Sequence, residues 1–514
     1  MSLFNPSQWK ATKSLSQFES EAGNVGLRRV LTKWSLTAIG IGCVVGAGIF
    51  VMTGLAAREY AGPALTISFL IAGMGCACAA LCYAEFASLL PVAGSAYSYS
   101  YATMGELFAW IIGWDLIIEY SMSSSTVAVG WSGYFMKLLA MFGIHLPLWL
   151  TSDPESAHNL IAEATRNGTL NELALKYSSI DLPTIGGFGI AINLPAILAS
   201  LTIMFILLRG IKEAANTNFA MVALKVGVVL FVIICGAFFV DTANWEPFIP
   251  MRGLNDKGDV AYGWQGIITA AGYVFYAYIG FDAVSTQASE AVNPKKDVPF
   301  GIIASLAICT ALYVLVSLVL TGMVKYTELD ITAPVAVAFI SNNMTYAAFF
   351  IAIAAVAGLT SVLLVNILAQ TRLFFSMSKD GLLPHRIFGK LHPRFQTPFN
   401  GTLITGIAIA VVAGLLPLTT IAKLVNIGTL FAFVVICIAV FIMRKKEPDA
   451  KRGFRVPWLP VVGTLGVLFN LTMMISLGWE NWVRLIVWMV IGLVIYFLYG
   501  QRNSRLRKQN QTNK

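Results

Sequence analysis

Apolar stretches long enough to cross a lipid bilayer recur along almost the whole chain. A membrane-spanning helix needs about 20 apolar residues, and lipid leaves no other partner for its backbone polar groups. Hydrophobic residues make up 57% of the 514 residues and charged residues 12%, about half the charged fraction of a soluble domain. We therefore predict an all-α, polytopic membrane protein. Its twelve predicted spans cover residues 34–58, 63–90, 103–136, 191–208, 214–240, 263–289, 299–323, 347–377, 400–416, 420–442, 457–477 and 482–500.

Basic residues are distributed unevenly between the two sides that these spans define. Clusters at 372–394, 444–455 and 502–514 fall on the side of the N-terminus, whereas the loops on the other side hold scattered basic residues. The positive-inside rule then predicts a multi-pass protein of the cell membrane with both termini in the cytoplasm. The net charge of +9 is explained by this membrane topology and implies no nucleic-acid partner.

The predicted spans divide the chain into three parts. Residues 1–33 form a polar cytoplasmic arm without the apolar core of a signal peptide. Residues 34–442 form a ten-helix core that includes a polar external loop at 143–190, and residues 443–514 add two helices and a basic cytoplasmic tail. The segment 91–106, rich in Tyr and Ser, is predicted to be a cytoplasmic loop before the third span.

Cysteine and histidine offer little for chemistry. All seven cysteines fall inside predicted spans, and Cys76 and Cys78 point to opposite sides of a helix, so we expect packing thiols without a disulfide or a metal. The four histidines lie in loops, and neither HExxH nor GxSxG is present. A membrane-embedded enzyme is therefore disfavoured, a receptor lacks a large soluble domain, and no cofactor is expected.

The first span, TAIGIGCVVGAGIFVMTG over residues 37–54, carries five glycines. Glycine costs a helix about 1 kcal/mol relative to alanine, so this span is predicted to open midway. The freed amides that start the second half-helix suit a carboxylate, and the carbonyls that end the first half suit an ammonium group. These two demands together describe an amino-acid site.

The sixth span repeats this feature, because Ile279-Gly280-Phe281-Asp282 interrupts a long apolar run. The two interrupted segments open two sets of five spans, and five crossings leave the second set inverted relative to the first. Paired interrupted helices in corresponding positions indicate a binding site near the bilayer midplane between inverted repeats. Spans eleven and twelve lie outside the repeat.

Ionisable side chains inside spans are costly and indicate a cavity or a partner. Asp115 and Glu119 are four residues apart on one helix face, and Glu119 lies nearer mid-span. A structural pair explains Asp115, and likewise Glu85, as well as a functional role does. Lys225 lies about three turns inside an apolar span, where burial favours the neutral form of an amine, so it is predicted to gain and lose a proton. The remaining intramembrane acids are Asp282 and Glu290.

Five segments match a known family in order. They are GIGCVVGAGIF, CYAEFASLLPVAGSAYSYSYATMGELFAWIIGWDLIIEY, the lysine of ALKVGVVL, FYAYIGFDAVST and QTRLFFSMSKDGLLP. Over about residues 27–500 the chain resembles the amino acid–polyamine–organocation superfamily, and within it the bacterial proton-coupled members of the cationic amino acid transporter family. The resemblance implies a LeuT-like inverted repeat of five plus five helices, here with two additional C-terminal helices.

The resemblance also implies a substrate site built from main-chain groups of the two interrupted spans, with Tyr276 as an aromatic gate over the substrate. Ala47 departs from the Ser or Thr that is common in such turns, so backbone amides alone would hold the carboxylate. The carboxylate would bind at Gly46, Ala47 and Gly48, and the ammonium group at the carbonyls of Val44, Tyr276 and Ile279.

Further positions carry over to side chains. Lys225 matches a lysine that replaces a sodium ion and reaches the opened first span and the hydroxyl of Thr360 or Ser361. Glu119 and Asn366 match positions at the side-chain end of the substrate pocket. Their polarity favours cationic substrates, while small neutral amino acids fit as well.

Together these features predict a proton-coupled symporter that brings L-amino acids into the cell by alternating access. An amino-acid exchanger would use the same residues, so symport and exchange both stay open. The partners expected are the amino acid, a proton and the lipid bilayer. The residues leave open whether a small membrane subunit or a particular lipid also binds.

Overall fold

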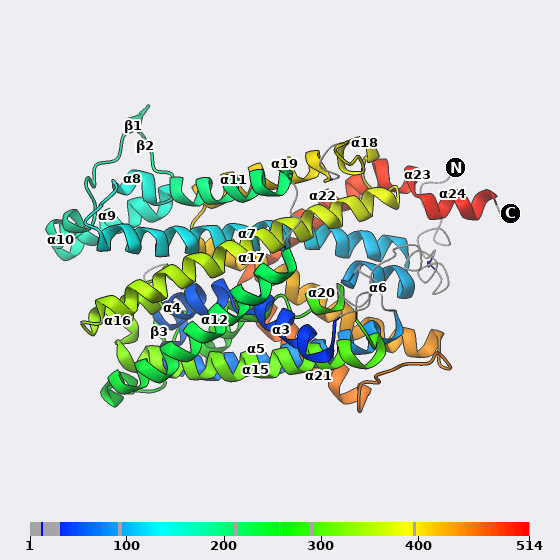
Figure 1. Ribbon diagram of the computed structural model, residues 1–514, viewed down its shortest axis with the longest axis horizontal. Coiled ribbons are helices and arrows are strands. Elements are labelled where there is room, and N and C mark those ends of the chain that lie inside the picture. The colour runs from blue at the N-terminus through cyan, green and yellow to red at the C-terminus, as the bar shows by residue number, and fades with distance from the viewer. Residues whose placement is uncertain are drawn as a thin grey trace.

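Long helices form the body of the molecule, which is a computed structural model (Figure 1). It describes residues 12–13, 31–90, 95–186, 188–209, 214–255, 258, 260–286, 291–393 and 397–512. Two short antiparallel strand pairs complete the described secondary structure, β1 (Thr184–Ile185) with β2 (Phe188–Gly189) and β3 (Gly253–Leu254) with β4 (Val260–Ala261).

The helices of the first part of the chain run to the start of the second interrupted segment. They are α3 (Lys33–Val44), a π-helical turn (Gly48–Met52), α4 (Thr53–Ala56), a second π-helical turn (Ala57–Ala61), a 3-10 turn (Gly62–Ala64), α5 (Leu65–Leu89), α6 (Ser95–Thr103), α7 (Glu106–Met141), α8 (Leu148–Thr151), α9 (Pro154–Asn167), α10 (Leu170–Lys176), α11 (Leu194–Arg209), α12 (Ala214–Gly236) and two 3-10 turns (Ala237–Phe239, Thr242–Trp245).

The helices of the second part run from the second interrupted segment to the C-terminal end. They are α13 (Gly263–Val274), a 3-10 turn (Phe275–Tyr278), α14 (Ala283–Thr286), α15 (Pro294–Met323), a 3-10 turn (Tyr326–Glu328), α16 (Pro334–Ser341), α17 (Thr345–Lys379), α18 (His385–Phe388), α19 (Phe399–Leu415), α20 (Leu418–Lys446), α21 (Leu459–Ser476), α22 (Trp479–Ile495), a π-helical turn (Tyr496–Gly500), α23 (Gln501–Asn503) and α24 (Arg505–Thr512).

Seven helical segments in the described part of the chain are long and apolar enough to cross a membrane, and α11 and α19 are shorter apolar helices. The chain is therefore a multi-pass membrane protein, and twelve crossings stay a prediction. The first halves of the two interrupted spans are not among the seven segments, because α3 and α13 have only 12 residues each. The seven segments are Gly48–Leu89, Met221–Phe239, Pro294–Met323, Thr345–Lys379, Leu418–Lys446, Leu459–Ser476 and Trp479–Lys508.

The helix α7 lies at the centre of the packing and contacts α17, α20, α19 and α11. On the other side of the bundle α15 packs along α5 and α3. Small residues let these helices approach closely, as membrane bundles require. For example, a Cβ added at Gly406 of α19 would lie 2.4 Å from Met204 Cγ of α11.

The polar stretch 143–190 forms the short helices α8, α9 and α10 and the β1–β2 hairpin at one end of the bundle (Figure 1). Asp153 caps α9 by accepting a hydrogen bond from the Ser156 amide at 2.9 Å. A small apolar cluster of Leu148, Ala157 and Ala191 holds these pieces together. The C-terminal helix α24 lies at the opposite end (Figure 1).

The prediction of a loop before the third long helix was wrong, because α6 is a helix over Ser95–Thr103. Its tyrosines are fixed by neighbours from distant parts of the chain. The Tyr97 hydroxyl donates to Asp380 Oδ2 at 2.7 Å, and the Tyr99 ring stacks on Phe86 with ring centroids 5.0 Å apart. This tertiary packing orders a Tyr/Ser-rich sequence that is a poor helix former by itself.

The helix α22 attaches to α7 through a pair of tryptophans. Trp114 Nε1 donates to the Trp488 carbonyl at 2.9 Å, and Trp488 Nε1 donates to the Trp114 carbonyl at 3.0 Å. The two rings stack with centroids 4.6 Å apart. The last long helix is therefore bound to the central helix by specific polar and aromatic contacts.

Candidate functional site

The first apolar segment is interrupted where its glycines predict an opening. The helix α3 ends at Val44, and Val45 is extended, with φ −73° and ψ 100°. The chain becomes helical again at Gly48, and the amides of Ile49 and Phe50 donate to the Gly46 carbonyl at 3.3 and 3.2 Å. The first N–H groups of a helix lack partners inside that helix, so the amides of Gly46, Ala47 and Gly48 are the ones suited to an anion.

The second interruption lies between α13 and α14. The 3-10 turn Phe275–Tyr278 ends at Ile279, which is extended with ψ 134°. Gly280 follows with φ +114°, a conformation that side chains with a Cβ rarely adopt. The chain then turns into the short helix Ala283–Thr286. Both predicted interruptions are therefore present.

The two interruptions lie directly against each other. A Cβ added at Gly48 would lie 2.2 Å from Ala277 Cα, and one added at Gly280 would lie 3.1 Å from the Cys43 carbonyl carbon. Gly48 is thus a point of backbone contact between the two segments. Only glycine permits this approach, since any side chain would meet the main chain of Ala277.

Tyr313 of α15 joins the two openings and was missed in the sequence. Its hydroxyl lies 2.8 Å from the Val44 carbonyl and 2.8 Å from the Ala277 carbonyl. A tyrosine hydroxyl has one hydrogen and can donate to one of them at a time. The remaining carbonyl keeps acceptor capacity of the kind that an ammonium group uses.

A polar chain leads from the second interruption to α17. The Tyr276 hydroxyl lies 3.2 Å from both the side-chain oxygen and the carbonyl of Ser123 in α7. Asn366 Nδ2 donates to Ser123 Oγ at 3.0 Å. The structure thus brings Tyr276 and Asn366 together through a serine that the sequence did not single out. The Ile279 amide donates to the Tyr276 carbonyl at 3.2 Å.

Lys225 of α12 lies 1% exposed beside the first interruption. Its ammonium nitrogen donates to the Gly42 carbonyl at 3.0 Å, two residues before α3 ends. Gly358 of α17 lies close, since a Cβ there would be 3.2 Å from Lys225 Cγ. The lysine thus contacts the opened segment and lies next to α17.

The Thr360 hydroxyl is bonded to other partners. It donates to the Val356 carbonyl at 2.7 Å and accepts from Trp131 Nε1 at 2.9 Å. Ser361 follows it in the same half-buried stretch of α17. The helix α17 therefore lies close to Lys225 at Gly358, whereas its Thr360 hydroxyl is bonded to Trp131 of α7.

Two acids of α7 are buried among the helices. Glu119 is 3% exposed with one carboxyl oxygen unbonded among the described residues, and Asp115 is 0% exposed with both oxygens unbonded. Asp282 follows the second interruption and is 7% exposed; its own carbonyl accepts from the Ser285 amide at 2.8 Å. Glu290 lies outside the described residues.

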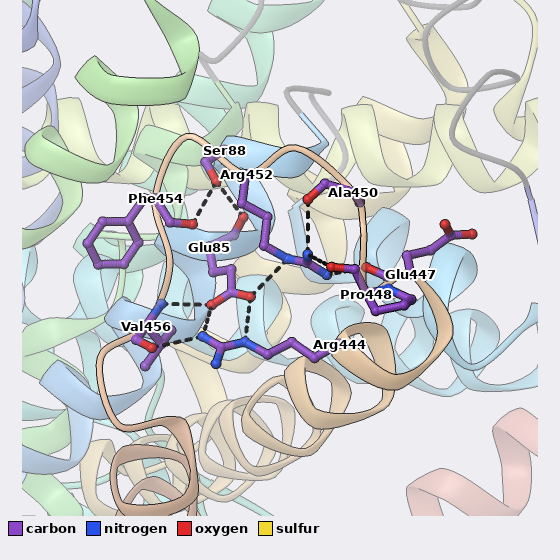
Figure 2. A network of polar contacts seen from close by, with 9 residues as sticks. All are labelled: Glu85, Ser88, Arg444, Glu447, Pro448, Ala450, Arg452, Phe454 and Val456. Atoms are coloured by element: carbon purple, nitrogen blue, oxygen red, sulfur yellow. Dashed lines mark hydrogen bonds and ion pairs between the residues drawn. The ribbon is translucent and has the colours of Figure 1, made fainter.

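Glu85 belongs to a structural network away from the interruptions (Figure 2). Its carboxylate accepts from Arg444 Nε at 2.9 Å and Nη2 at 2.6 Å, and from the Val456 amide at 2.7 Å. Arg452 Nε lies 3.2 Å away. The carboxylate therefore binds the loop between α20 and α21 to α5. Of the two explanations that the sequence left open for Glu85, a structural pair and a functional role, these contacts favour the structural pair.

The described part of the chain contains no cluster of side chains that could bind a metal ion. No set of three or more His, Cys, Asp or Glu side chains there is placed to hold a metal. The seven cysteines are free thiols. The polar groups at the two interruptions are instead amides, carbonyls, hydroxyls, a lysine and buried carboxyls, which are groups for recognising a small polar solute.

Comparison with known proteins agrees with this site. Residues 31–499 match the family model described as amino acid permease. The chain is 45% identical over 488 residues to the branched-chain amino acid permease BcaP of Bacillus subtilis (strain 168), which covers 95% of this chain and 96% of that protein. It is 44% identical over 496 residues to the methylthioribose transporter of the same strain, covering 96% and 98%.

The resemblance to cationic amino acid transporters is present at lower identity. Cationic amino acid transporter 9, chloroplastic, of Arabidopsis thaliana is 33% identical over 572 residues, covering 98% of this chain and 92% of that protein. The two Bacillus proteins thus resemble the chain more than this transporter does. The match over nearly the whole length identifies a membrane transporter and not an enzyme: the chain belongs to the amino acid permease family.

Proposed function

We propose that this permease is a proton-coupled symporter that brings neutral L-amino acids, branched-chain ones included, into the cell by alternating access. The contact of Lys225 with the Gly42 carbonyl carries the proposal, because it joins a proton-binding group to the opened helix. The fold proposed for this function is the LeuT-like repeat of five plus five helices with two appended ones. The core is residues 34–442, and 1–33 and 443–514 flank it.

The main-chain groups at the two interruptions account for the parts that all amino acids share. The amides of Gly46, Ala47 and Gly48 start a helical turn, where the helix dipole favours a carboxylate. The carbonyls of Val44, Tyr276 and Ile279 are the proposed partners of the ammonium group. This role is supported for Val44 by its contact with the Tyr313 hydroxyl, whose single hydrogen cannot satisfy Val44 and Ala277 together.

The side-chain end of the proposed site favours an uncharged substrate. Asn366 is already bonded to Ser123, and Ser123 to Tyr276, so this amide is engaged by the protein. Val362 faces the first opening, since a Cβ added at Gly46 would lie 3.0 Å from Val362 Cγ2. Glu119 would attract a cationic side chain only in its charged form. A relative named as a branched-chain amino acid permease fits the same preference.

Lys225 is the proposed coupling group. In its protonated form it donates to the Gly42 carbonyl and steadies the first opened segment, and burial favours loss of the proton as the site rearranges. Thr360 and Ser361 lie on the adjoining helix α17, and we propose that one of their hydroxyls replaces Gly42 as a partner in another state of the cycle. Transport would then require no sodium.

We also propose that both termini lie in the cytoplasm of the cell. Lys13 Nζ lies 3.6 Å from Asp380 Oδ1, and the Arg505 amide donates to the Asp380 carbonyl at 3.0 Å. Residues from both ends of the chain therefore meet at one end of the bundle, as an even number of crossings requires. The basic residues of the α20–α21 loop support the cytoplasmic assignment.

The test is uptake into proteoliposomes with an imposed pH gradient, acid outside, and no amino acid inside. L-Leucine should accumulate without sodium and accumulate more as external pH falls. Lys225→Met and Lys225→Arg should both lose gradient-driven accumulation, since arginine keeps the charge but does not release its proton. Lys176→Met, which changes an exposed lysine of α10, is the matched control and should behave as the unmodified protein.

Competition experiments test the proposed substrate preference, and the uptake outcomes test the transport mechanism. L-Leucine should compete for its own uptake more strongly than L-arginine or methylthioribose. Uptake that needs internal amino acid would identify an exchanger, and undiminished accumulation in Lys225→Arg would remove the coupling role of this lysine. Transport of methylthioribose without that of L-leucine would overturn the amino-acid site.

A further inference from the structure

Asp115 is a buried acid of α7 that the proposed mechanism does not use. Its side chain is 0% exposed, and neither carboxyl oxygen has a hydrogen-bond partner among the described residues. The carboxyl points at α20, where a Cβ added at Gly428 would lie 2.8 Å from Asp115 Oδ1. The glycine of α20 thus leaves room for a carboxyl group between the two helices.

A carboxylate without partners in such a place would be very costly. Charged groups in a membrane interior pair with one another, contact water-filled cavities or become neutral. The nearest ionisable side chain on the same face of α7 is Glu119, one helical turn away, and an acid offers Asp115 no compensating positive charge. The physical conclusion is that Asp115 is protonated in this arrangement.

Among the described residues, no cation from the helices that pack on α7 is bonded to the Asp115 carboxyl group. Their charged side chains stand toward helix ends or on exposed faces, and α19 carries none within its bounds. Arg444 is already paired with Glu85, and the titratable side chains of α6 are tyrosines. The others are Arg209 in α11, Arg372 and Lys379 in α17, Lys423, Lys445 and Lys446 in α20, and Glu480 and Arg484 in α22.

The position of Asp115 along α7 shows toward which side of the membrane its proton would leave. Glu106 at the start of α7 contacts Ser504 and Arg507 of the C-terminal segment, so this end of α7 is the proposed cytoplasmic one. Asp115 lies nine residues further, about 14 Å along the helix, and Glu119 about 6 Å beyond it. Asp115 thus lies between Glu119 and the cytoplasm.

The surroundings of Glu119 suit a protonated acid as well. Its side chain is 3% exposed, and one of its carboxyl oxygens is buried without a hydrogen-bond partner among the described residues. A charged carboxylate in such a place is costly, so the physical argument for Asp115 applies to Glu119 too.

We propose that Asp115 and Glu119 form a proton relay along α7 that carries the coupling proton to the cytoplasm. Protonated Asp115 releases its proton to the cytoplasmic side and becomes a carboxylate. Glu119 then passes its own proton to Asp115 across one helical turn, and the incoming coupling proton restores Glu119. One proton crosses per cycle, and no bond other than O–H forms or breaks. The relay rests on the proposed proton coupling.

The first test compares Asp115→Asn with the unmodified protein in proteoliposomes, using L-leucine. A one-unit pH gradient sustains about tenfold accumulation at one proton per substrate, and the variant should fall to about onefold. Exchange of internal for external L-leucine should persist, because the substrate site is intact. Thr126→Val changes another buried, unbonded polar side chain of α7 without a titrating proton, so this control should accumulate normally.

The second test reads the proton directly and does not depend on transport. The infrared band of a protonated carboxyl group should weaken in purified Asp115→Asn at neutral pH, and an unchanged band would overturn the relay.

A third test uses uptake. Gly428→Ala should push the carboxyl of Asp115 aside and shift the pH of half-maximal uptake without removing exchange. This variant decides the matter if Asp115→Asn does not fold.

The outcomes separate the relay from the proposed function. If the unmodified protein accumulates L-leucine and Asp115→Asn does so equally, the relay is wrong while proton coupling stands. If the unmodified protein shows no response to the pH gradient, proton coupling is wrong and the relay falls with it.

Discussion

Gly46 and Gly48 stand two residues apart in the same opening but meet different neighbours. A Cβ at Gly48 would lie 2.2 Å from the Cα of Ala277, which is backbone, whereas one at Gly46 would lie 3.0 Å from a methyl group of Val362. A side chain can rotate away, but the backbone of the second interruption cannot move without opening the contact between the two segments.

We therefore predict that Gly48→Ala lowers the thermal stability of the purified protein and abolishes L-leucine uptake, with an overpacking cost of about 1–3 kcal/mol. Gly46→Ala should keep most of both properties. Thermal unfolding with and without L-leucine, together with uptake, measures the difference. Equal effects of the two substitutions would show that the contact with Ala277 is not what requires the glycine.

At this scale the sequence revealed residues that are costly in their surroundings. Glycines in an apolar span and a lysine far from either interface stand out, and both interruptions and the buried Lys225 are present in the structure. Tyr313 and Ser123 could not be found in this way. Tyrosine and serine are ordinary in apolar helices, and their importance comes from contacts with residues far away in the chain.

The short helix α16 is held by a carboxylate in the turn before it. Asp330 Oδ1 accepts from the amides of Thr332 and Ala333 at 2.9 and 2.8 Å, and Lys137 Nζ lies 3.1 Å from Oδ2. Burial alone would raise the pKa of Asp330. The lysine and the two amides outweigh burial and hold this pKa well below its usual range.

This pKa shift predicts a pH-dependent contribution to stability. A depressed pKa in the folded state stabilises the protein above the unfolded value of about 4, and the contribution is lost as pH falls toward the folded value. Asp330→Asn should lower the melting temperature at pH 7, and the difference from the unmodified protein should narrow below about pH 4. Asp330→Ala should cost more, since asparagine still accepts from the two amides. A difference that does not change with pH would contradict the charge effect.

The helix α6 shows where prediction at the element scale fails. Its sequence SAYSYSYAT lacks the apolar periodicity of a helix, so local pattern and propensity favoured a loop. The structure supplies what the pattern lacks, because Tyr97 and Tyr101 find carboxyl partners in Asp380 and Glu106. The long helices could be predicted because lipid imposes one solution on any apolar run of sufficient length.

Across the whole molecule, Glu106 joins segments from distant parts of the chain. The side chain is 0% exposed and lies at the start of α7. Its oxygens accept from Tyr101 of α6 at 3.1 Å and from Tyr496 at 2.9 Å, and Arg507 Nε lies 2.9 Å away. Arg507 also donates to the Tyr496 hydroxyl at 2.8 Å. This buried acid therefore binds the C-terminal helix α24 to the core, beside the contact of the Arg505 amide with the Asp380 carbonyl.

Removing either charge of this pair should destabilise the molecule, because the other charge is left buried without its partner, at a cost of about 3–5 kcal/mol. Glu106→Gln and Arg507→Met should each lower the melting temperature clearly, and the double variant should lose less than the sum of the two. Limited proteolysis should cut α24 sooner in each variant. Arg502→Ala removes an exposed basic residue of the same segment and should leave both measurements unchanged. Strictly additive losses in the double variant would show that Glu106 and Arg507 act independently and that α24 is held by other contacts.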